Sequence, residues 1–159
     1  MKNIDKKVVD DFGEEWNQYS QNTSSKTISD IDLESAWNQY FNIFPFDDLK
    51  EDAQGFDMGC GSGRWAQFVA DKVHKLNCID PSEKALNVAK KNLSKFTNIS
   101  FYNASVNDEV LERNSQDFGY CLGVLHHIPN TLDGIKACSD LLKKDAPFLM
   151  YLYYNFENR

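Results

Sequence analysis

A glycine-rich stretch, residues 53–64 (AQGFDMGCGSGR), places the strongest constraint on how this chain can fold. The residues before the glycines predict a short buried strand over 53–58, and helix-spaced apolar residues after them predict a helix over 63–73. Gly59, Gly61 and Gly63 allow the main chain to turn sharply and a ligand to approach the backbone closely. Unpaired N–H groups at the predicted helix start favour an anion. The stretch therefore predicts a ligand-binding turn.

Strand and helix patterns alternate from about residue 50 onward. We predict strands over 53–58, 75–80, 98–103, 117–122 and 147–154, helices over 63–73, 83–95 and 132–143, and an irregular turn over 107–113. Such alternation predicts an α/β fold with an open, mainly parallel sheet and helices on both faces. Ligands bind such sheets at the carboxyl ends of the strands, near the point where strand order reverses.

Residues 1–47 have a different pattern, with no strand-like alternation and with aromatic residues at helical spacing. We therefore expect two parts, an N-terminal helical segment over 1–47 and an α/β domain over 48–159. The aromatic residues of the segment pack its helices onto the sheet in the simplest interpretation.

Composition argues against several classes of function. The net charge of −7 disfavours a nucleic acid partner, whose binding depends on lysine and arginine. The four cysteines, at positions 60, 78, 121 and 138, form no C-x-x-C pair, so no zinc or other metal site is expected. No apolar run reaches the length of a signal peptide or of a membrane span, which takes about 20 residues. We expect a cytoplasmic protein.

The glycine spacing separates two kinds of nucleotide site. A dinucleotide fingerprint counted from Gly59 requires glycine at its sixth position, where this chain has Arg64. The run Asp57-Met58-Gly59-Cys60-Gly61-Ser62-Gly63 instead resembles the first motif of the class I S-adenosylmethionine-dependent methyltransferases, which are Rossmann-like. A second segment, Gly123-Val124-Leu125-His126-His127-Ile128, resembles the sequence after the fourth strand of that family. The resemblance covers roughly residues 53–154.

The resemblance implies a function and a cofactor. The chain would transfer a methyl group from S-adenosyl-L-methionine directly to a small-molecule acceptor and release S-adenosyl-L-homocysteine. Asp80 lies 21 residues after Gly59, where an acidic side chain can accept hydrogen bonds from both ribose hydroxyls. Relatives carry an aspartate near adenine where this chain has Ser105, which is a departure from the pattern.

The residues that the resemblance assigns to the site come from four predicted loops. The glycine loop would hold the methionyl group and Asp57 its ammonium, while the loops after the second and third strands would hold ribose and adenine. Leu122 and Gly123 would face the methionine part, and His127 is the candidate general base. The predicted cofactor site comprises Asp57, Gly59, Cys60, Gly61, Ser62, Gly63, Asp80, Pro81, Ser82, Ala104, Ser105, Val106, Leu122 and Gly123.

The resemblance also bears on the two ends of the chain. Trp16 or Tyr19 would belong to a lid, because an N-terminal helical segment often covers the active site in the family. The family usually adds two further strands and a helix after the last strand predicted here, so we expect a C-terminally truncated domain. An incomplete sheet exposes an edge through which the chain could form an oligomer.

Three other interpretations stay open. The chain could bind S-adenosylmethionine without completing catalysis, since the final strands are absent. A nicotinamide-dependent oxidoreductase would bind NADH instead of S-adenosylhomocysteine. In a purely structural domain the glycines would serve only a turn.

Overall fold

The computed structural model describes residues 3–18 and 28–153, and its centre is a five-stranded parallel sheet. The strands are β1 (Gln54–Met58), β2 (Lys75–Asp80), β3 (Ile99–Asn103), β4 (Phe118–Leu122) and β5 (Phe148–Tyr151). Their order in the sheet is β3-β2-β1-β4-β5, and every neighbouring pair is parallel. Strand order therefore reverses between β1 and β4. The predicted Rossmann-like fold is confirmed, and each predicted strand is present within the bounds expected for it.

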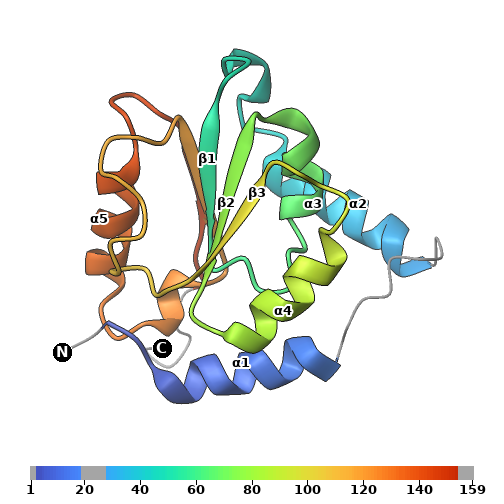
Figure 1. The fold of residues 1–159 in the computed structure, drawn as a ribbon, viewed down its shortest axis with the longest axis vertical. Coiled ribbons are helices and arrows are strands. Elements are labelled where there is room, and N and C mark those ends of the chain that lie inside the picture. The colour runs from blue at the N-terminus through green and yellow to red at the C-terminus, as the bar shows by residue number, and fades with distance from the viewer. Residues whose placement is uncertain (1–2, 19–27, 154–159) are drawn as a thin grey trace, which may run out of the picture.

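Helices cover both faces of this sheet (Figure 1). The helices α2 (Ile28–Phe41), α3 (Ala66–Val69) and α4 (Glu83–Asn92) lie on one face, and α5 (Thr131–Leu141) lies on the other. Alternate strand residues divide accordingly into two cores. Leu76 and Tyr120 pack with α2, α3 and α4, whereas Phe56, Ile79 and Cys121 pack with α5.

Polar caps fix the starts of α4 and α5. Ser82 Oγ accepts a hydrogen bond from Ala85 N at 3.3 Å, and Asn130 Oδ1 accepts one from Asp133 N at 3.2 Å. Such caps satisfy N–H groups that have no partner inside the helix. Because Ser82 and Asn130 directly follow loops at the carboxyl ends of strands, the caps also hold those loops in place.

The helix predicted over 63–73 is the main correction to the predicted elements. The chain makes turns until Trp65, then the single α-helical turn of α3, and then a 3₁₀ turn, η2 (Ala70–Lys72). Gly61 and Gly63 have φ angles of 54° and 80°, and a right-handed helix cannot include such residues. The backbone is already extended at Val73, which leads into β2.

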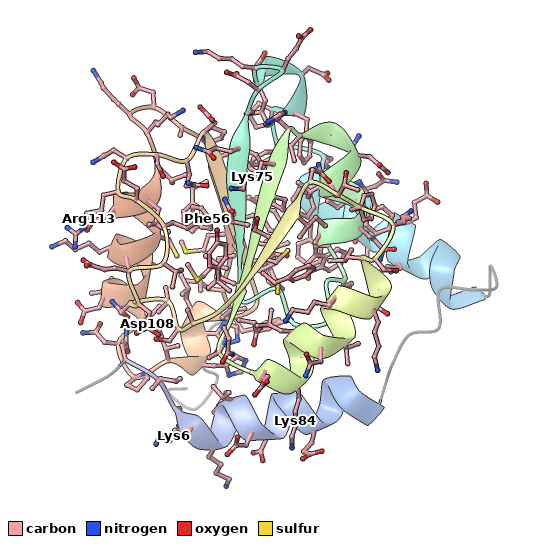
Figure 2. The ribbon with its side chains drawn as sticks, viewed as in Figure 1. Lys6, Phe56, Lys75, Lys84, Asp108 and Arg113 are labelled. Atoms are coloured by element: carbon pink, nitrogen blue, oxygen red, sulfur yellow. The ribbon has the colours of Figure 1, made fainter. Side chains whose placement is uncertain are left out.

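The N-terminal segment forms α1 (Lys6–Gln18) and α2, and α1 lies across the carboxyl end of the sheet (Figure 1). In Figure 2, Lys75 at the start of β2 and Asp108 beyond β3 lie at opposite ends of the sheet. Lys6 and Lys84 lie at the same end as Asp108 in that view. Tyr19 is outside the described residues, and the side chain of Trp16 is not described either.

A close contact joins α1 to α4. A Cβ atom added to Gly13 would lie 2.5 Å from Ser82 Oγ, so the glycine permits the approach of the two helices. Glu14 forms an ion pair with Lys84 one residue further along. The helix α1 is thereby held beside the residue that caps α4.

The described ranges, 3–18 and 28–153, contain no helix with the length and the apolar character that crossing a bilayer requires. They also contain no group of three or more potential metal ligands.

Candidate functional site

A cavity of about 440 Å³ lies at the carboxyl ends of the strands, between the strand loops and the N-terminal segment. Its size falls within the range of about 300–1,000 Å³ that is usual for small-molecule sites. The predicted residues that line it are Gly59, Cys60, Gly61, Asp80, Pro81, Ser82, Ala104, Ser105, Val106, Leu122, Gly123 and His127. Asp57, Ser62 and Gly63 do not line it among the described residues. The fold thus brings residues from four separate loops to one cavity.

The glycine loop is fixed against β2 by main-chain hydrogen bonds. Gly59 N and Cys60 N both donate to Ile79 O, at 2.8 and 3.1 Å. Gly59 has a φ of 79°, and a Cβ added to it would lie 2.5 Å from Val124 Cγ2. Only glycine fits there without displacing the loop that follows β4. The loop therefore presents bare main chain to the cavity.

Asp80 links this loop to the end of β2. Its Oδ2 accepts a hydrogen bond from Gly61 N at 2.9 Å, and its Oδ1 accepts one from Ser82 N at 2.8 Å. Burial raises the pKa of Asp80, and the two N–H donors oppose that shift. Each carboxylate oxygen can accept a further hydrogen bond, so the group can still receive two hydroxyls from a ligand in the cavity.

Asp57 lies behind the cavity, in the core beneath the glycine loop. Its side chain is buried beside Tyr120, and neither its Oδ2 nor the Tyr120 hydroxyl has a partner with hydrogen-bond geometry among residues 3–18 and 28–153. Burial raises the pKa of Asp57 to about 8, the nearby Tyr120 hydroxyl opposes the shift, and the charge of Asp80 adds to it. The predicted contact of Asp57 with a ligand ammonium remains a prediction.

The loop after β3 contains a pair that the sequence analysis did not identify. Ser105 N and Ser105 Oγ both donate hydrogen bonds to Asp108 Oδ2, at 2.9 and 3.0 Å. Ser105 is buried and lines the cavity between Ala104 and Val106. A carboxylate is thus present at this loop after all, three residues later than in the family pattern.

The two adjacent histidines lie in the 3₁₀ turn η3 (Leu125–His127), and only His127 lines the cavity. Burial lowers the pKa of His127, so its imidazole is neutral at pH 7. His126 points elsewhere: both its ring nitrogens are buried without a hydrogen-bond partner in the described part of the chain. Its ring lies 4.0 Å from that of His127 and 4.7 Å from that of Tyr153. Of the two histidines, His127 is therefore the one that borders the cavity.

An aromatic wall, formed by Tyr40, Trp65, Tyr151 and Tyr153, also lines the cavity. The Tyr40 and Tyr151 rings lie 5.0 Å apart edge to face, and Tyr151 and Tyr153 are also 5.0 Å apart. This wall was not predictable from the sequence, because its residues come from α2, the glycine loop and the end of β5. The aromatic spacing over 33–44 was a signal for Tyr40, but the pattern could not distinguish core from cavity.

The start of the N-terminal segment also lines the cavity, through residues that were not predicted. These are Asn3, Ile4, Asp5, Val8 and Val9. Asn3 and Asn130 exchange two hydrogen bonds, from Asn3 Nδ2 to Asn130 O at 2.8 Å and from Asn130 N to Asn3 Oδ1 at 2.7 Å. The segment is thus attached to the loop that follows His127.

Comparison with known proteins agrees with this geometry. A family model described as a methyltransferase domain matches residues 56–145. The chain belongs to this methyltransferase family. The methyltransferase domain is 31% identical over 150 residues to the ubiquinone biosynthesis O-methyltransferase of Dechloromonas aromatica, covering 90% of this chain and 61% of that protein. It spans between 37% and 61% of the length of the curated relatives that it matches.

Solved structures share the fold of the methyltransferase domain. A protein from Methanococcus maripaludis, described as S-adenosyl-L-methionine-dependent methyltransferase, has a TM-score of 0.72 at 17% identity, with 96% of this chain and 67% of that one covered. Phosphoethanolamine N-methyltransferase 1 of Haemonchus contortus, in complex with phosphoethanolamine and S-adenosylhomocysteine, has a TM-score of 0.64 at 16% identity, with 90% and 32% covered. The resemblance to class I S-adenosylmethionine-dependent methyltransferases is confirmed.

Proposed function

We propose that this chain binds S-adenosyl-L-methionine in the cavity and transfers its methyl group to a hydroxyl of a small-molecule acceptor. The observation that carries the proposal is the Asp80 carboxylate, which lines the cavity while hydrogen-bonded to Gly61 N of the glycine loop. The carboxylate that would bind the ribose hydroxyls is therefore joined by a hydrogen bond to the glycine loop that would receive the methionyl group. The Dechloromonas relative is named as an O-methyltransferase, which supports oxygen as the acceptor atom.

The residues present fit this cofactor. Asp80 would accept the ribose hydroxyls, and the Gly59–Gly61 loop and Gly123 would leave room for the methionyl group, while Ser105 and Val106 would border the adenine. When bound, the sulfonium of the cofactor supplies an already activated methyl group. The chain itself has to align the two reactants and exclude water. Good alignment alone can lower the activation free energy by about 7 kcal/mol or more.

The acceptor would lie against the aromatic wall, beside His127. A neutral imidazole can take the acceptor's hydroxyl proton on a ring nitrogen. The N-terminal segment, residues 1–47, would serve as a lid over the cavity, because Asn3 and Val8 line it. The predicted part of Trp16 or Tyr19 in this lid stays a prediction. The domain proper would then comprise residues 48–159.

A second candidate function is cofactor binding without turnover. It is supported by the length comparison, because the chain spans no more than 61% of the relatives compared. Binding of S-adenosylhomocysteine together with no methylation of any acceptor, and recovery of activity in a longer chain, would favour this alternative.

The first test is a calorimetric comparison of S-adenosylhomocysteine, NADH and ATP. We expect S-adenosylhomocysteine alone to bind, and Asp80→Asn to weaken it at least about tenfold because a charge-assisted hydrogen bond contributes about 1.5–3 kcal/mol. Asp71→Asn, an exposed carboxylate on η2, is the matched control and should leave affinity unchanged. Binding of NADH in preference to S-adenosylhomocysteine would refute the proposal.

The second test concerns His127, with a water-soluble phenol as acceptor, which offers a hydroxyl and a ring that fits the aromatic wall. A base must be unprotonated, so the rate should fall as pH drops through the pKa of His127, and that pKa lies below its ordinary value. His127→Gln should lower the rate about 100-fold or more and remove this acid limb. His74→Gln, at an exposed position, should change neither. An unchanged pH profile in His127→Gln would exclude the base role.

The remaining partner and location assignments are proposals of the same kind. All four cysteines are free thiols in buried positions, which supports a reducing compartment, and we assign the cytoplasm. The net charge of −7 supports the absence of a nucleic acid substrate. The outer strands β3 and β5 offer edges for an oligomer.

A further inference from the structure

Arg64 is the one lysine or arginine among the described residues that line the cavity. Two carboxylates, Asp5 and Asp80, line it as well, and both accept main-chain hydrogen bonds. Asp5 Oδ1 accepts from Lys7 N at 3.0 Å, and Asp80 Oδ2 accepts from Gly61 N at 2.9 Å. A permanently charged guanidinium in the cavity of a chain with a net charge of −7 is suited to an anionic group of a ligand.

The guanidinium of Arg64 lies at the aromatic wall. Its central carbon is 5.6 Å from the ring centroid of Trp65, and the Trp65 ring meets the Tyr40 ring edge to face at 5.4 Å. Burial raises the pKa of Tyr40, and the positive charge of Arg64 opposes that shift, so the charge acts on the wall itself. The main chain is held at this point, because Gln67 Nε2 donates to Arg64 O at 2.9 Å.

A flat cation beside aromatic rings favours a particular kind of ligand. A guanidinium can donate two parallel N–H bonds to a carboxylate, and aromatic side chains pack well against another ring. A ligand that uses both features combines an aromatic ring with a carboxylate. An aliphatic alcohol would use neither feature, and an uncharged phenol would use the wall alone.

We propose that the methyl acceptor is an aromatic hydroxy acid, a phenol whose ring also bears a carboxylate, and that Arg64 determines this specificity by binding the carboxylate. The inference rests on the proposed function, because it takes the cavity to hold S-adenosylmethionine and the wall to hold the acceptor. The phenolic oxygen forms the new bond to the methyl carbon, the carbon–sulfur bond of the sulfonium breaks, and the phenolic proton passes to His127. The carboxylate takes no part in these bond changes.

The test measures the binding of two ligands by calorimetry, with the chain already saturated with S-adenosylhomocysteine. One ligand is 3-hydroxybenzoate, and the other is 3-hydroxybenzamide, which has the same ring and hydroxyl but no charge. We expect the benzoate to bind at least about tenfold more tightly, because hydrogen bonds between charged groups are stronger than those to a neutral amide. A ratio of affinities near one, or no binding of either ligand, would overturn the proposal.

Arg64 is tested through the same ratio of affinities. Arg64→Gln should bring the ratio to about one and leave the affinity for S-adenosylhomocysteine unchanged. Arg64→Lys keeps the charge without the planar fork of donors, so it should retain only part of the preference. Lys72→Gln removes an exposed cation on η2, outside the described lining of the cavity, and as the control it should alter neither the ratio nor the affinity for S-adenosylhomocysteine.

The same variant separates this role from binding of the cofactor's own carboxylate. If Arg64→Gln weakens S-adenosylhomocysteine and leaves the ratio unchanged, Arg64 serves the cofactor, and the proposal is overturned. If S-adenosylhomocysteine does not bind the unaltered chain, the proposed function itself is refuted. If it binds and the unaltered chain shows no preference for the benzoate, only the assignment of the acceptor is refuted.

Discussion

Two buried carboxylates, Asp57 and Asp80, lie near the ends of neighbouring strands and have different surroundings. Asp80 accepts two main-chain hydrogen bonds and lines the cavity. Asp57 is buried in the core beside Tyr120, its Oδ2 has no hydrogen-bond partner in the described part of the chain, and its pKa is raised to about 8. At pH 7 Asp57 is therefore mostly protonated.

The raised pKa of Asp57 predicts a pH-dependent stability. Because the folded-state value of about 8 exceeds the unfolded value of about 3.9, the contribution of Asp57 to stability is complete below pH 4 and is lost as pH rises to 8. Asp57→Asn removes this titration while keeping the side-chain size. Denaturant unfolding should show that the free energy of unfolding falls more between pH 5 and pH 8 in the unaltered chain than in Asp57→Asn. The difference should be about 1.4 kcal/mol for each pH unit between the two pKa values.

The exposed Asp71 provides the control for that experiment. The stability of Asp71→Asn should depend on pH in the same way as that of the unaltered chain, because the Asp71 side chain is exposed to solvent. Parallel stability profiles for Asp57→Asn and the unaltered chain would contradict the raised pKa.

At single positions the sequence predicted which residues line the cavity better than which hydrogen bonds those residues form. The glycine loop and Asp80 were predictable because their spacing reflects a local strand and turn. The Ser105–Asp108 pair was not, because a serine and an aspartate three residues apart in a loop have many possible partners. The burial of Asp57 depends on α2 and α3 covering its face of the sheet, and no local pattern contains that information.

At the scale of elements, α1 is held on α4 by a contact that only glycine permits. Alanine normally favours a helix over glycine by up to about 1 kcal/mol, so Gly13→Ala should be stabilising in an isolated helix. Here the added Cβ would lie 2.5 Å from Ser82 Oγ, which caps α4. We expect Gly13→Ala to loosen α1, to expose the segment to limited proteolysis and to speed release of S-adenosylhomocysteine in stopped-flow measurements.

Glu14→Ala serves as the comparison, because it removes only an exposed ion pair with Lys84. Its proteolysis and ligand release should stay close to those of the unaltered chain. Release rates that are the same in Gly13→Ala and in the unaltered chain would show that α1 does not cover the site.

The helix predicted over 63–73 shows where periodicity alone is insufficient. Phe68 and Val69 do pack into the core, as their spacing indicated. Yet the positive φ angles of Gly61 and Gly63 delay the helix, and the approach to β2 ends it early. Periodicity identified the buried face, whereas backbone conformation determined the length.

The whole molecule depends on an aromatic core between α2 and the sheet. Trp37 and Phe41 stack at 3.8 Å, and Phe41 meets Tyr120 edge to face at 5.3 Å. Phe41→Ala should lower the free energy of unfolding by about 3–5 kcal/mol because it leaves a cavity. Ile43→Ala, at a position with 77% of its surface exposed, should change it by no more than about 0.5 kcal/mol. Equal losses in the two variants, measured by denaturant unfolding, would contradict this packing.

The alternation of strands and helices made the parallel sheet predictable over the whole chain. The N-terminal segment was predictable as helical, but its placement was not, since α1 meets the cavity through tertiary contacts such as Asn3 with Asn130. The aromatic wall was missed for the same reason, because its members converge only after the fold has formed.

All five strands run in the same direction, so the turns that lead into them lie at the amino ends of the strands, at the opposite end of the sheet from the cavity. Asn114 and Asp145, both with positive φ, lie in such turns before β4 and β5. These turns are suitable points for attaching a fluorophore or for anchoring the protein to a sensor surface, because they lie at the opposite end of the strands from the cavity.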